Sequence, residues 1–295
     1  MTGRPGASAP YSWRSMPTRA VCTASLLASI GLLLSAPSAI ASTGARGPEL
    51  ERDALALVRT TARVHRAIDL WRAQGNPSIP RPPLRVELAA LTQQRLVIRL
   101  AADPRRADAV LARVRGPLRA DVVATVRARL ALLRLGHGPP RLLRAFRTGR
   151  PVPPDVLLRY YRQAQRRFQV GWHVLAAVNF VESAFGRLRS PSWAGALGPM
   201  QFLPSTWRAY GLGGDVHDPQ DAILGAANYL HASGAPRDYR RALYAYNPVS
   251  SYAEAVLRYA ERMKRDRRAF YTYYSWQVFV RTPAGLRRLT GPGLR

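Results

Sequence analysis

The sequence contains little cysteine, lysine or acid. Its 295 residues include one cysteine, Cys22, and one lysine, Lys264. A single cysteine cannot close a disulfide within the chain, so we expect no disulfide framework. Acidic residues number 17 against 45 basic ones, which gives a formal charge of +28, nearly all of it from arginine.

The positive charge narrows the classes of partner without choosing one. The electrostatic field of such a charge favours the binding of polyanions, which include nucleic acid, anionic lipid and acidic wall polymers. The same arginine excess, together with much alanine and leucine, is also what genome base composition can produce. Hydrophobic residues make up 47% of the chain. That share is enough to bury a core, which excludes a wholly disordered protein.

The first 41 residues carry a targeting pattern. Three arginines without any acid precede an apolar stretch over residues 20–34, and an A-x-A cleavage site follows at residues 39–41. These are the three parts of a secretory signal peptide, so we predict export to the periplasm or cell wall, with Cys22 lost on cleavage. The apolar stretch is too short to span a membrane comfortably. An uncleaved anchor is the alternative.

Hydrophobic periodicity predicts a mainly α-helical fold for the rest of the chain. Apolar residues at three- and four-residue steps indicate helices over residues 48–73, 86–102 and 118–135. Segments rich in glycine and proline interrupt them. We interpret residues 42–150 as a helical accessory region, because no group of residues in it suggests chemistry.

Two further units follow along the chain. Residues 151–264 are predicted to form a second, lysozyme-like helical domain, with helices at 155–168, 171–185, 219–231, 239–246 and 250–262 and a short one from Pro204. Residues 265–295 form a basic aromatic tail. Its aromatic and β-branched stretch at 271–280, a turn at 283–285 and apolar residues at 286–289 predict a small β-hairpin.

Several kinds of site are not indicated by the sequence. The five histidines never stand at ligand spacing with a carboxylate: His65, His137, His173, His217 and His231. There is no G-x-S-x-G nucleophile elbow and no phosphate-binding glycine loop. The aspartates at 215, 218 and 221 lack the spacing of a calcium-binding EF-hand. We therefore predict no metal site and no cofactor.

The helix expected over residues 171–185 carries one acid on its apolar face. Glu182 lies four residues after Val178 and three before Phe185, both in the apolar stripe. Gly186 is the expected C-cap, so Glu182 falls in the last turn. Burial and the negative end of the helix dipole both raise the pKa of such a carboxyl. A glutamate protonated near neutral pH is suited to general acid catalysis.

The periodicity leaves a second interpretation open, in which Glu182 lies at the edge of the stripe and pairs with Arg187 or Arg189. The following segment favours the catalytic interpretation. No Asp or Glu occurs between residues 183 and 214, and residues 192–202 are small, rich in glycine and uncharged. Glycine lets the backbone approach a ligand closely.

Neutral polar and aromatic side chains gather in two places after this helix. The amide of Gln201 offers a donor and an acceptor, which suits the hydroxyl and amide groups of sugars. Three nearby side chains offer apolar faces for sugar rings: Met200, Phe202 and Trp207. A second group combines aromatic and amide side chains: Tyr246, Asn247 and Tyr252. Each aromatic taken singly is typical of core packing, but the combination favours a carbohydrate site.

Four motifs occur in order: Val181-Glu182-Ser183, G-A-L-G-P-M-Q-F-L-P-S-T-W at 195–207, A-A-N-Y-L at 226–230 and A-Y-N at 245–247. Together they resemble the lytic transglycosylase domain of the goose-type-lysozyme-like superfamily. The G-P-M-Q-F form resembles the membrane-bound transglycosylase B-like branch more than the soluble branch. The resemblance covers about residues 153–263 and leaves out the accessory region and the tail.

The resemblance implies roles for the matching residues. The glutamate of the E-S motif is the family's single catalytic acid and base, which corresponds to Glu182. The serine before the A-G-A-x-G run orients the N-acetyl group of the sugar, which corresponds to Ser192. The remaining expected substrate-binding residues are Met200, Gln201, Phe202, Tyr246, Asn247 and Tyr252. The loop at 212–218 is shorter than the aspartate-rich loop often found in this branch, which weakens any metal site carried over from relatives.

The residues and the resemblance agree on a reaction. Ordinary glycosidases use two carboxylates around the scissile bond, whereas the motif core here supplies one. One acid suffices if the substrate supplies its own nucleophile. Glu182 would protonate the glycosidic oxygen and then deprotonate the C6 hydroxyl, closing a 1,6-anhydro ring on muramic acid. The implied substrate is the bond between N-acetylmuramic acid and N-acetylglucosamine in peptidoglycan.

Other functions stay open on the sequence alone. The carbohydrate site could belong to a catalytically idle module that only binds peptidoglycan. It could also belong to a lysozyme-type hydrolase in which Asp215 or Asp218 positions water. A polyanion-binding protein that acts through its arginines is a third class. We expect a monomer that binds peptidoglycan strands, with anionic wall polymers as a second candidate partner and no specific nucleic acid.

Overall fold

The computed structural model describes residues 47–79, 81–136 and 141–294. The predicted signal peptide over residues 1–41 and Cys22 lie outside these residues. Within them the fold is mainly helical, with one antiparallel two-stranded sheet, as the sequence predicts. None of the described helices combines the length and apolar composition that a membrane crossing requires.

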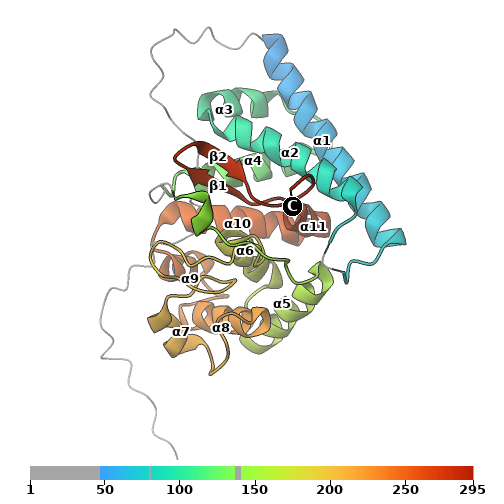
Figure 1. Cartoon of the computed structure of the whole chain (residues 1–295). Helices are drawn as coiled ribbons and strands as arrows, with labels where there is room; N and C mark the ends of the chain where they lie inside the picture. The colour runs from blue at the N-terminus through green and yellow to red at the C-terminus, as the bar shows by residue number, and fades with distance from the viewer. Residues whose placement is uncertain (1–46, 80, 137–140, 295) are drawn as a thin grey trace, which may run out of the picture.

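The first half of the chain forms a group of helices that lies on one side of the molecule in Figure 1. The elements are α1 (Gly47–Gln74), α2 (Leu84–Ala101), α3 (Pro104–Arg113), α4 (Arg119–Leu133) and a 3-10 turn, η2 (Leu143–Ala145). The periodicity places α1, α2 and α4 within two residues of their ends. It misses α3, which begins where Asp103 caps the helix by accepting the Arg106 N–H at 3.0 Å.

The second half forms the opposite side of the molecule and its centre (Figure 1). Its elements are α5 (Pro154–Phe168), α6 (Trp172–Ser183), α7 (Pro204–Tyr210), α8 (Pro219–Ala232), α9 (Tyr239–Tyr246), α10 (Ser250–Arg265) and α11 (Arg267–Ser275). The six helices predicted over residues 151–264 are confirmed. Central α10 packs against both α4 and α6, so one continuous apolar core takes side chains from both halves. The division of the chain at residues 150 and 264 stays a prediction.

The tail differs from the prediction at residues 271–275. These residues belong to α11, and the hairpin consists of the shorter strands β1 (Phe279–Thr282) and β2 (Gly285–Arg288). The stretch was expected to be a strand because aromatic residues favour strands. In the structure nearly the whole of α11 is buried, and it packs against α1, α2 and α6. Burial of the aromatic side chains on neighbouring helices therefore outweighs local propensity.

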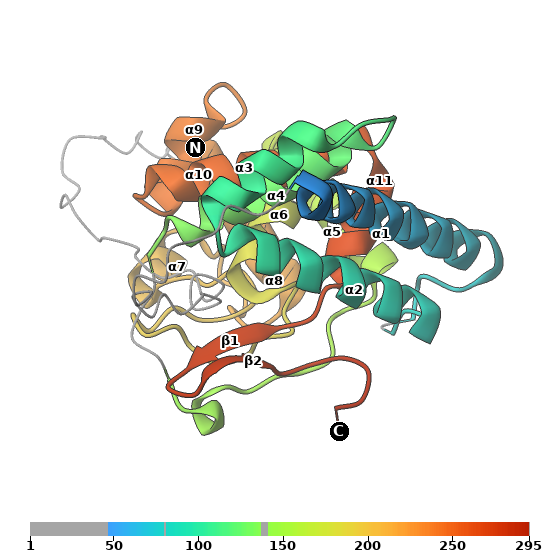
Figure 2. The same ribbon diagram turned by 90° about the horizontal axis from the view of Figure 1, so that it is seen from above.

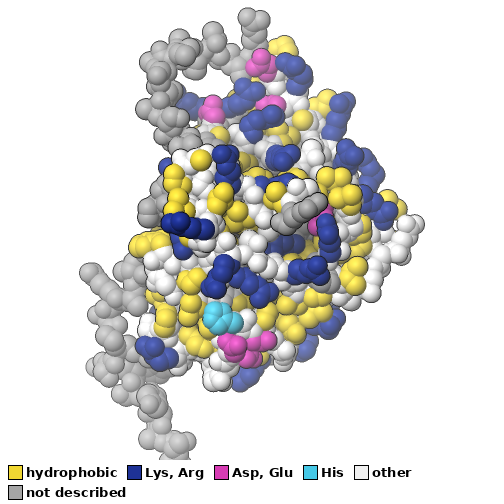
Figure 3. Space-filling model, in the orientation of Figure 1, with side chains coloured by type: hydrophobic (Ala, Val, Ile, Leu, Met, Phe, Trp, Pro, Cys, Tyr) yellow, Lys and Arg dark blue, Asp and Glu magenta, His cyan; other side chains and the backbone are white. Residues whose placement is uncertain are grey.

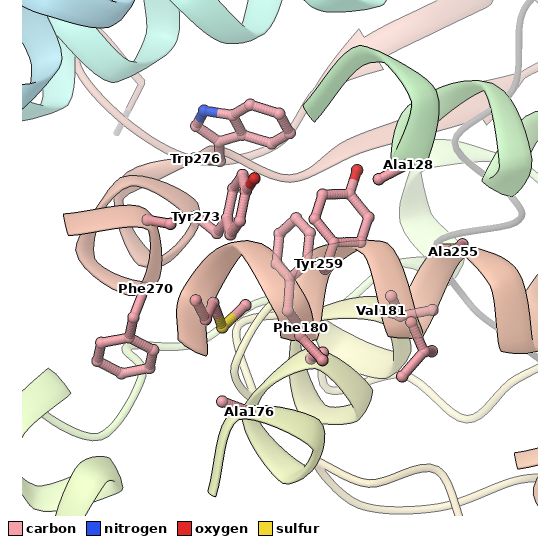
Figure 4. Close-up of a cluster of buried hydrophobic side chains, with 14 of the residues drawn as sticks. Ala128, Ala176, Phe180, Val181, Ala255, Tyr259, Phe270, Tyr273 and Trp276 are labelled. Carbon is pink, nitrogen blue, oxygen red and sulfur yellow. The ribbon is translucent and has the colours of Figure 1, made fainter. Parts of the chain in front are cut away.

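The core around α6 is aromatic, and its rings come from α6, α10 and α11 (Figure 4). The ring of Phe180 on α6 lies between Tyr259 of α10 and Tyr273 of α11, with centroids at 4.9 and 5.3 Å. Trp276, just after α11, lies 6.0 Å from the same ring. Such pairs each contribute about 0.5–1.5 kcal/mol beyond the burial of area. They hold α6 in place.

The hairpin packs on the outside of α2, at the edge of the molecule in the view from above (Figure 2). Phe279 of β1 and Leu286 of β2 form a small apolar cluster with Leu91 and Ile98 of α2. The Gln94 side chain of α2 donates to the Gln277 carbonyl at 2.8 Å and accepts the Gln277 N–H at 2.8 Å. The end of the chain is thus fixed to the first helical group.

Candidate active site

Helix α6 ends immediately after Glu182, in an unusual backbone conformation. Ala184, Phe185 and Gly186 all have positive φ, at 52°, 62° and 79°. The C-cap is therefore Ala184 and not Gly186 as predicted. Left-handed backbone is unfavourable for Ala and Phe. The N–H groups of Ala184 and Phe185 donate to the Phe180 and Asn179 carbonyls at 3.0 and 3.2 Å, which completes the helix end.

Glu182 is buried in the last turn of α6, as predicted, with an exposed fraction of 2%. The hydroxyl of Tyr252, on α10, donates to Glu182 Oε1 at 2.7 Å. The two arginines considered as partners turn elsewhere. Arg187 donates to the Ala184 carbonyl at 3.3 Å and Arg189 to the Arg150 carbonyl at 3.0 Å. The site therefore holds its carboxyl group against a tyrosine hydroxyl.

Polar side chains on the neighbouring face of α6 connect the helix end to the loop at residues 192–202. Ser183 Oγ donates to the Pro199 carbonyl at 2.5 Å and accepts the Gly186 N–H at 2.8 Å. Asn179 Nδ2 donates to the Tyr161 hydroxyl at 2.9 Å. Ser183 belongs to one of the sequence motifs, but the sequence indicates no role for it. A buried asparagine four residues earlier in an otherwise apolar helix was the signal that could have indicated this network.

Ser192 opens the loop and holds its turn. Its Oγ accepts the N–H groups of Ala194 and Ala196 at 3.2 and 3.0 Å. A hydroxyl has two acceptor lone pairs and one donor hydrogen. These two contacts use the acceptor capacity, so the hydroxyl hydrogen is left to donate to an acceptor such as a carbonyl oxygen.

The second half of the loop is a tight turn closed by a bridge between Leu197 and Phe202. Gln201 takes the left-handed conformation, with φ of 51°, and its Nε2 donates to the Gly198 carbonyl at 2.9 Å. Only glycine fits at 198. Its φ is +72°, and a Cβ there would lie 1.8 Å from the Val216 carbonyl oxygen. The backbone geometry thus fixes where the Gln201 amide lies.

Aromatic rings connect this turn to Tyr252. The Tyr246 hydroxyl donates to the Met200 carbonyl at 2.6 Å, and its ring lies parallel to that of Tyr252 with centroids 6.4 Å apart. Phe202 packs edge-on against Tyr246 at 5.9 Å. Met200 and Phe202 are buried. Their apolar faces, expected to meet sugar rings, are used in packing in this conformation and support the turn from behind.

Two buried amide oxygens in this region have no hydrogen-bond donor among the described residues. They are Gln201 Oε1 and Asn247 Oδ1, and both side chains are about 5% exposed or less. An unsatisfied buried acceptor costs about 1–3 kcal/mol. Such a cost is typical of sites where a ligand supplies the missing donor. The structure thus assembles Glu182, Tyr252, Tyr246 and the turn through Gln201 into one connected set.

The aspartates proposed as alternative water-positioning groups lie in the exposed loop before α8. Asp218 caps that helix by accepting the N–H groups of Gln220 and Asp221 at 2.8 and 3.0 Å. Asp215 accepts the His217 N–H at 2.8 Å, and Asp221 accepts the Asp215 N–H at 3.0 Å. These carboxylates thus stabilise the loop and the start of α8 by accepting backbone N–H groups.

One cluster of potential metal ligands was not visible in the sequence spacing. Oxygen and nitrogen atoms of His65, Asp121 and Asp266 lie within 4.8 Å of one another. Arg262 Nη2 lies among them, 3.4 Å from His65 Nε2, 2.6 Å from Asp121 and 3.3 Å from Asp266. The guanidinium supplies the positive charge between the two aspartates.

The His65 imidazole in this cluster is held neutral. Burial, followed by the positive charge of Arg268, lowers the pKa of His65 from 6.5 to about 4. Arg262 Nη2 is close to Nε2, so a proton there would face a guanidinium. The cluster connects α1, α4 and the end of α10, which indicates that it stabilises the fold.

A comparison with protein families gives one match. Residues 188–241 match the family model described as Transglycosylase SLT domain. The matched segment contains the 192–202 loop, α7 and α8, and it excludes Glu182 and Tyr252. Searches of curated proteins and of solved structures returned no match. The family match supports the lytic transglycosylase and lysozyme-like superfamily, whose SLT domains act on peptidoglycan outside the cytoplasm.

Proposed function

We propose that the protein is an exported peptidoglycan lytic transglycosylase of the membrane-bound transglycosylase B-like branch, with Glu182 as its acid and base. The observation that carries this proposal is the placement of Glu182. It is buried in the last turn of α6, it accepts a hydrogen bond from the Tyr252 hydroxyl, and it lies next to a turn that carries no charge. The family match over residues 188–241 supports the substrate class.

In the first step Glu182 donates its proton to the glycosidic oxygen between N-acetylmuramic acid and N-acetylglucosamine. The bond from muramic C1 to that oxygen breaks, and the N-acetylglucosamine oxygen leaves as a hydroxyl. The carboxyl group has become a carboxylate. A buried carboxylate is stabilised by a hydrogen-bond donor, and the Tyr252 hydroxyl is such a donor at 2.7 Å.

In the second step the Glu182 carboxylate removes the proton from the C6 hydroxyl of the muramic sugar. The C6 oxygen attacks C1 and closes the 1,6-anhydro ring, which returns Glu182 to its protonated form. The nucleophile is already tethered to the reacting carbon, which gives it a large effective concentration. A single acid is therefore sufficient, and no cofactor takes part.

Three of the predicted residues are proposed to bind the sugars: Ser192, Gln201 and Asn247. The Ser192 hydroxyl keeps its hydrogen for an acceptor, which suits the N-acetyl carbonyl of the substrate. The amide oxygens of Gln201 and Asn247 lack donors among the described residues, and sugar hydroxyl and amide groups supply donors. Tyr246 holds the turn through the Met200 carbonyl. Substrate binding is thus proposed to satisfy acceptors that the fold leaves unsatisfied.

The test is digestion of purified peptidoglycan with mass analysis of the fragments. We expect muramic acid ends in the anhydro form, each fragment one water lighter than a lysozyme product. The Glu182→Gln variant keeps size and shape but lacks the proton, so we expect it to bind glycan and to cleave none of it. Glu261→Gln is the matched control, since it makes the same change from acid to amide at an exposed position of α10.

Each alternative function has its own outcome in this test. Ordinary reducing ends would show that the protein is a hydrolase and not a transglycosylase, with Asp215 or Asp218 positioning the water. Binding of peptidoglycan without any cleavage by the unaltered protein would identify an idle binding module. Cleavage by a folded Glu182→Gln variant at the rate of the unaltered protein would place the acid elsewhere.

Export, the monomeric state and the accessory role of residues 42–150 belong to the same proposal. Mass spectrometry of secreted protein tests the first, because cleavage after Ala41 gives a mature chain beginning at Ser42. A mature protein that begins far from Ser42, or retains its first 41 residues, would contradict the cleavage site.

A further inference from the structure

A cavity of about 440 Å³ lies apart from the candidate active site. Its walls come from the start of α2, the segment around residues 148–151, Arg187 and the end of the chain near Gln277 and Thr290. None of the predicted catalytic or sugar-binding residues lines it. In Figure 3 arginine side chains gather on this face, between the hairpin and α5. The cavity is lined by three arginines: Arg81, Arg150 and Arg187.

Arg187 is the buried member of this set, with an exposed fraction of 5%. Its guanidinium donates to the Ala184 carbonyl at 3.3 Å and lies 4.6 Å from the centroid of the Tyr274 ring. Among the described residues no carboxylate oxygen lies within 4.0 Å of it. Burial lowers the pKa of Arg187, but arginine keeps its proton in proteins. A buried cation without a close anion is costly, so the position favours an anion from outside.

The backbone fixes the Arg187 side chain at the cavity wall. Residues 148 and 188 form an isolated antiparallel bridge, and the Gly149 N–H donates to the Arg187 carbonyl at 2.9 Å. The Arg189 N–H donates to the Arg147 carbonyl at 2.9 Å. The two chain segments that carry Arg150 and Arg187 are therefore held side by side.

Among the described residues that line the cavity, Glu87 is the one that carries a carboxyl group, and it does not balance the arginines. Glu87 Oε2 lies 3.6 Å from Arg81 Nε. Burial raises the pKa of Glu87, which weakens its negative charge, although the charges of Arg81 and Arg187 act against that rise. With Glu87 ionised, the described wall residues carry an excess of two positive charges. The excess lies on Arg150, which is exposed, and Arg187, which is buried.

Two neutral polar side chains of the wall, those of Thr290 and Gln277, are already engaged. Thr290 Oγ1 donates to Gln277 Oε1 at 2.9 Å and accepts the Val278 N–H at 2.9 Å. Gln277 Nε2 donates to the Ser275 carbonyl at 2.8 Å. Recognition in this cavity therefore falls to the guanidinium groups, which favour an anion over an uncharged sugar.

We propose that this cavity is a binding site for an oxyanion, a carboxylate or phosphate group, held between Arg150 and Arg187. Guanidinium groups present parallel N–H donors that match both kinds of oxyanion. Two sources share this chemistry: the free carboxylate of a peptide and the phosphate groups of an anionic wall polymer. The proposal does not depend on the reaction assigned to Glu182, because the two sites share no residue.

Calorimetric titration of the whole mature protein tests the site. The probes are inorganic phosphate, N-acetyl-alanine as a simple peptide carboxylate, and poly(glycerol phosphate). Arg150→Gln leaves the core intact and is expected to weaken binding about tenfold or more, the loss of one charge-assisted hydrogen bond. Arg187→Gln is expected to abolish it. Glu87→Gln, which removes the competing carboxylate, is expected to strengthen binding.

The matched control is Arg63→Gln, which removes an equal charge from the exposed face of α1. If the anion binds in the cavity, the Arg63→Gln variant keeps the affinity of the unaltered protein. Equal weakening of binding by Arg63→Gln and Arg150→Gln would show non-specific attraction and overturn the proposal. Absence of binding to all three probes would also overturn it. If Arg187→Gln does not fold, the opposite effects of Arg150→Gln and Glu87→Gln on the affinity still test the proposal. Tighter binding of the carboxylate or of the phosphate probes identifies the source.

Discussion

Replacement of Tyr252 by phenylalanine isolates the hydrogen bond that reaches Glu182. Tyr252 has an exposed fraction of 0%, and its hydroxyl donates to Glu182 Oε1 at 2.7 Å. Phenylalanine keeps the ring, and with it the parallel packing against Tyr246 at 6.4 Å. The variant therefore removes one donor and leaves the shape of the site.

The size of the effect follows from the charge that Glu182 acquires during the reaction. A hydrogen bond to a charged group is worth about 1.5–3 kcal/mol, against about 0.5–1.5 kcal/mol for a neutral pair. In the proposed reaction the carboxylate forms only after proton transfer, so the donor is most valuable on the way to that state. The variant loses the difference between the two, about 1–1.5 kcal/mol. With each 1.36 kcal/mol equal to a factor of ten, we expect Tyr252→Phe to lower kcat by about 5- to 13-fold.

Turnover of soluble glycan strands, followed by mass analysis, measures this effect. The substrate KM is expected to change much less than kcat, because the lost contact is with Glu182 and not with the sugar. A donor to a carboxylate also favours its ionised form, so its removal is expected to shift the alkaline limb of the pH–rate profile to higher pH. The melting temperature provides the control for folding.

Two results would refute this reasoning. Unchanged kcat in a folded Tyr252→Phe variant would show that the hydroxyl does not support the reacting carboxyl. A rise in KM alone, with kcat and the pH profile unaltered, would show that Tyr252 contacts substrate and that its bond to Glu182 has no part in the chemistry.

The other predictions concern stability. Since the folded-state pKa of His65 is about 4 against 6.5 when unfolded, the unfolded chain binds the proton first, so stability is full above pH 6.5 and falls as the pH drops toward 4. The loss between neutral pH and about pH 5 is about 2 kcal/mol, and urea titrations of His65→Gln should show a correspondingly flatter dependence. Gly198→Ala should lower stability by at least about 1–3 kcal/mol beyond backbone strain, because its Cβ meets the Val216 carbonyl. Gly213→Ala, with similar φ and open space, is the control, and equal melting temperatures for the two variants would contradict the clash.

The sequence predicted the helices well wherever an apolar stripe was long. It missed α3, because Asp103 and Pro104 look like a chain break until they are seen as a cap and first turn. It placed a strand where Tyr271 to Ser275 are helical, because the packing that decides their conformation comes from helices far away in the chain. Local patterns carry no information about such neighbours.

The candidate site was predictable in part. The burial of Glu182 followed from periodicity, since Val178 lies one turn before it on the apolar stripe, although Phe185, the other neighbour in that stripe, lies beyond the end of α6. Its contact with Tyr252 did not, because 70 residues separate the two, and only the resemblance grouped them. The burial of Met200 and Phe202 depends on Tyr246 and could not be read from their own segment. The Arg187 cavity likewise could not be predicted, because the fold forms it from segments that lie far apart in the sequence.

The late position of α11 in the chain has a consequence for biosynthesis. Phe270, Tyr273 and Trp276 fill the centre of the core between the two helical groups. A chain synthesised from its N-terminus cannot close that core until α11 and Trp276 have been made. Until then the facing surfaces of α1, α2 and α6 lack the side chains that cover them. Completion of the core therefore waits for the synthesis of α11, and a chain delivered across a membrane in the unfolded state would assemble its core only on the far side.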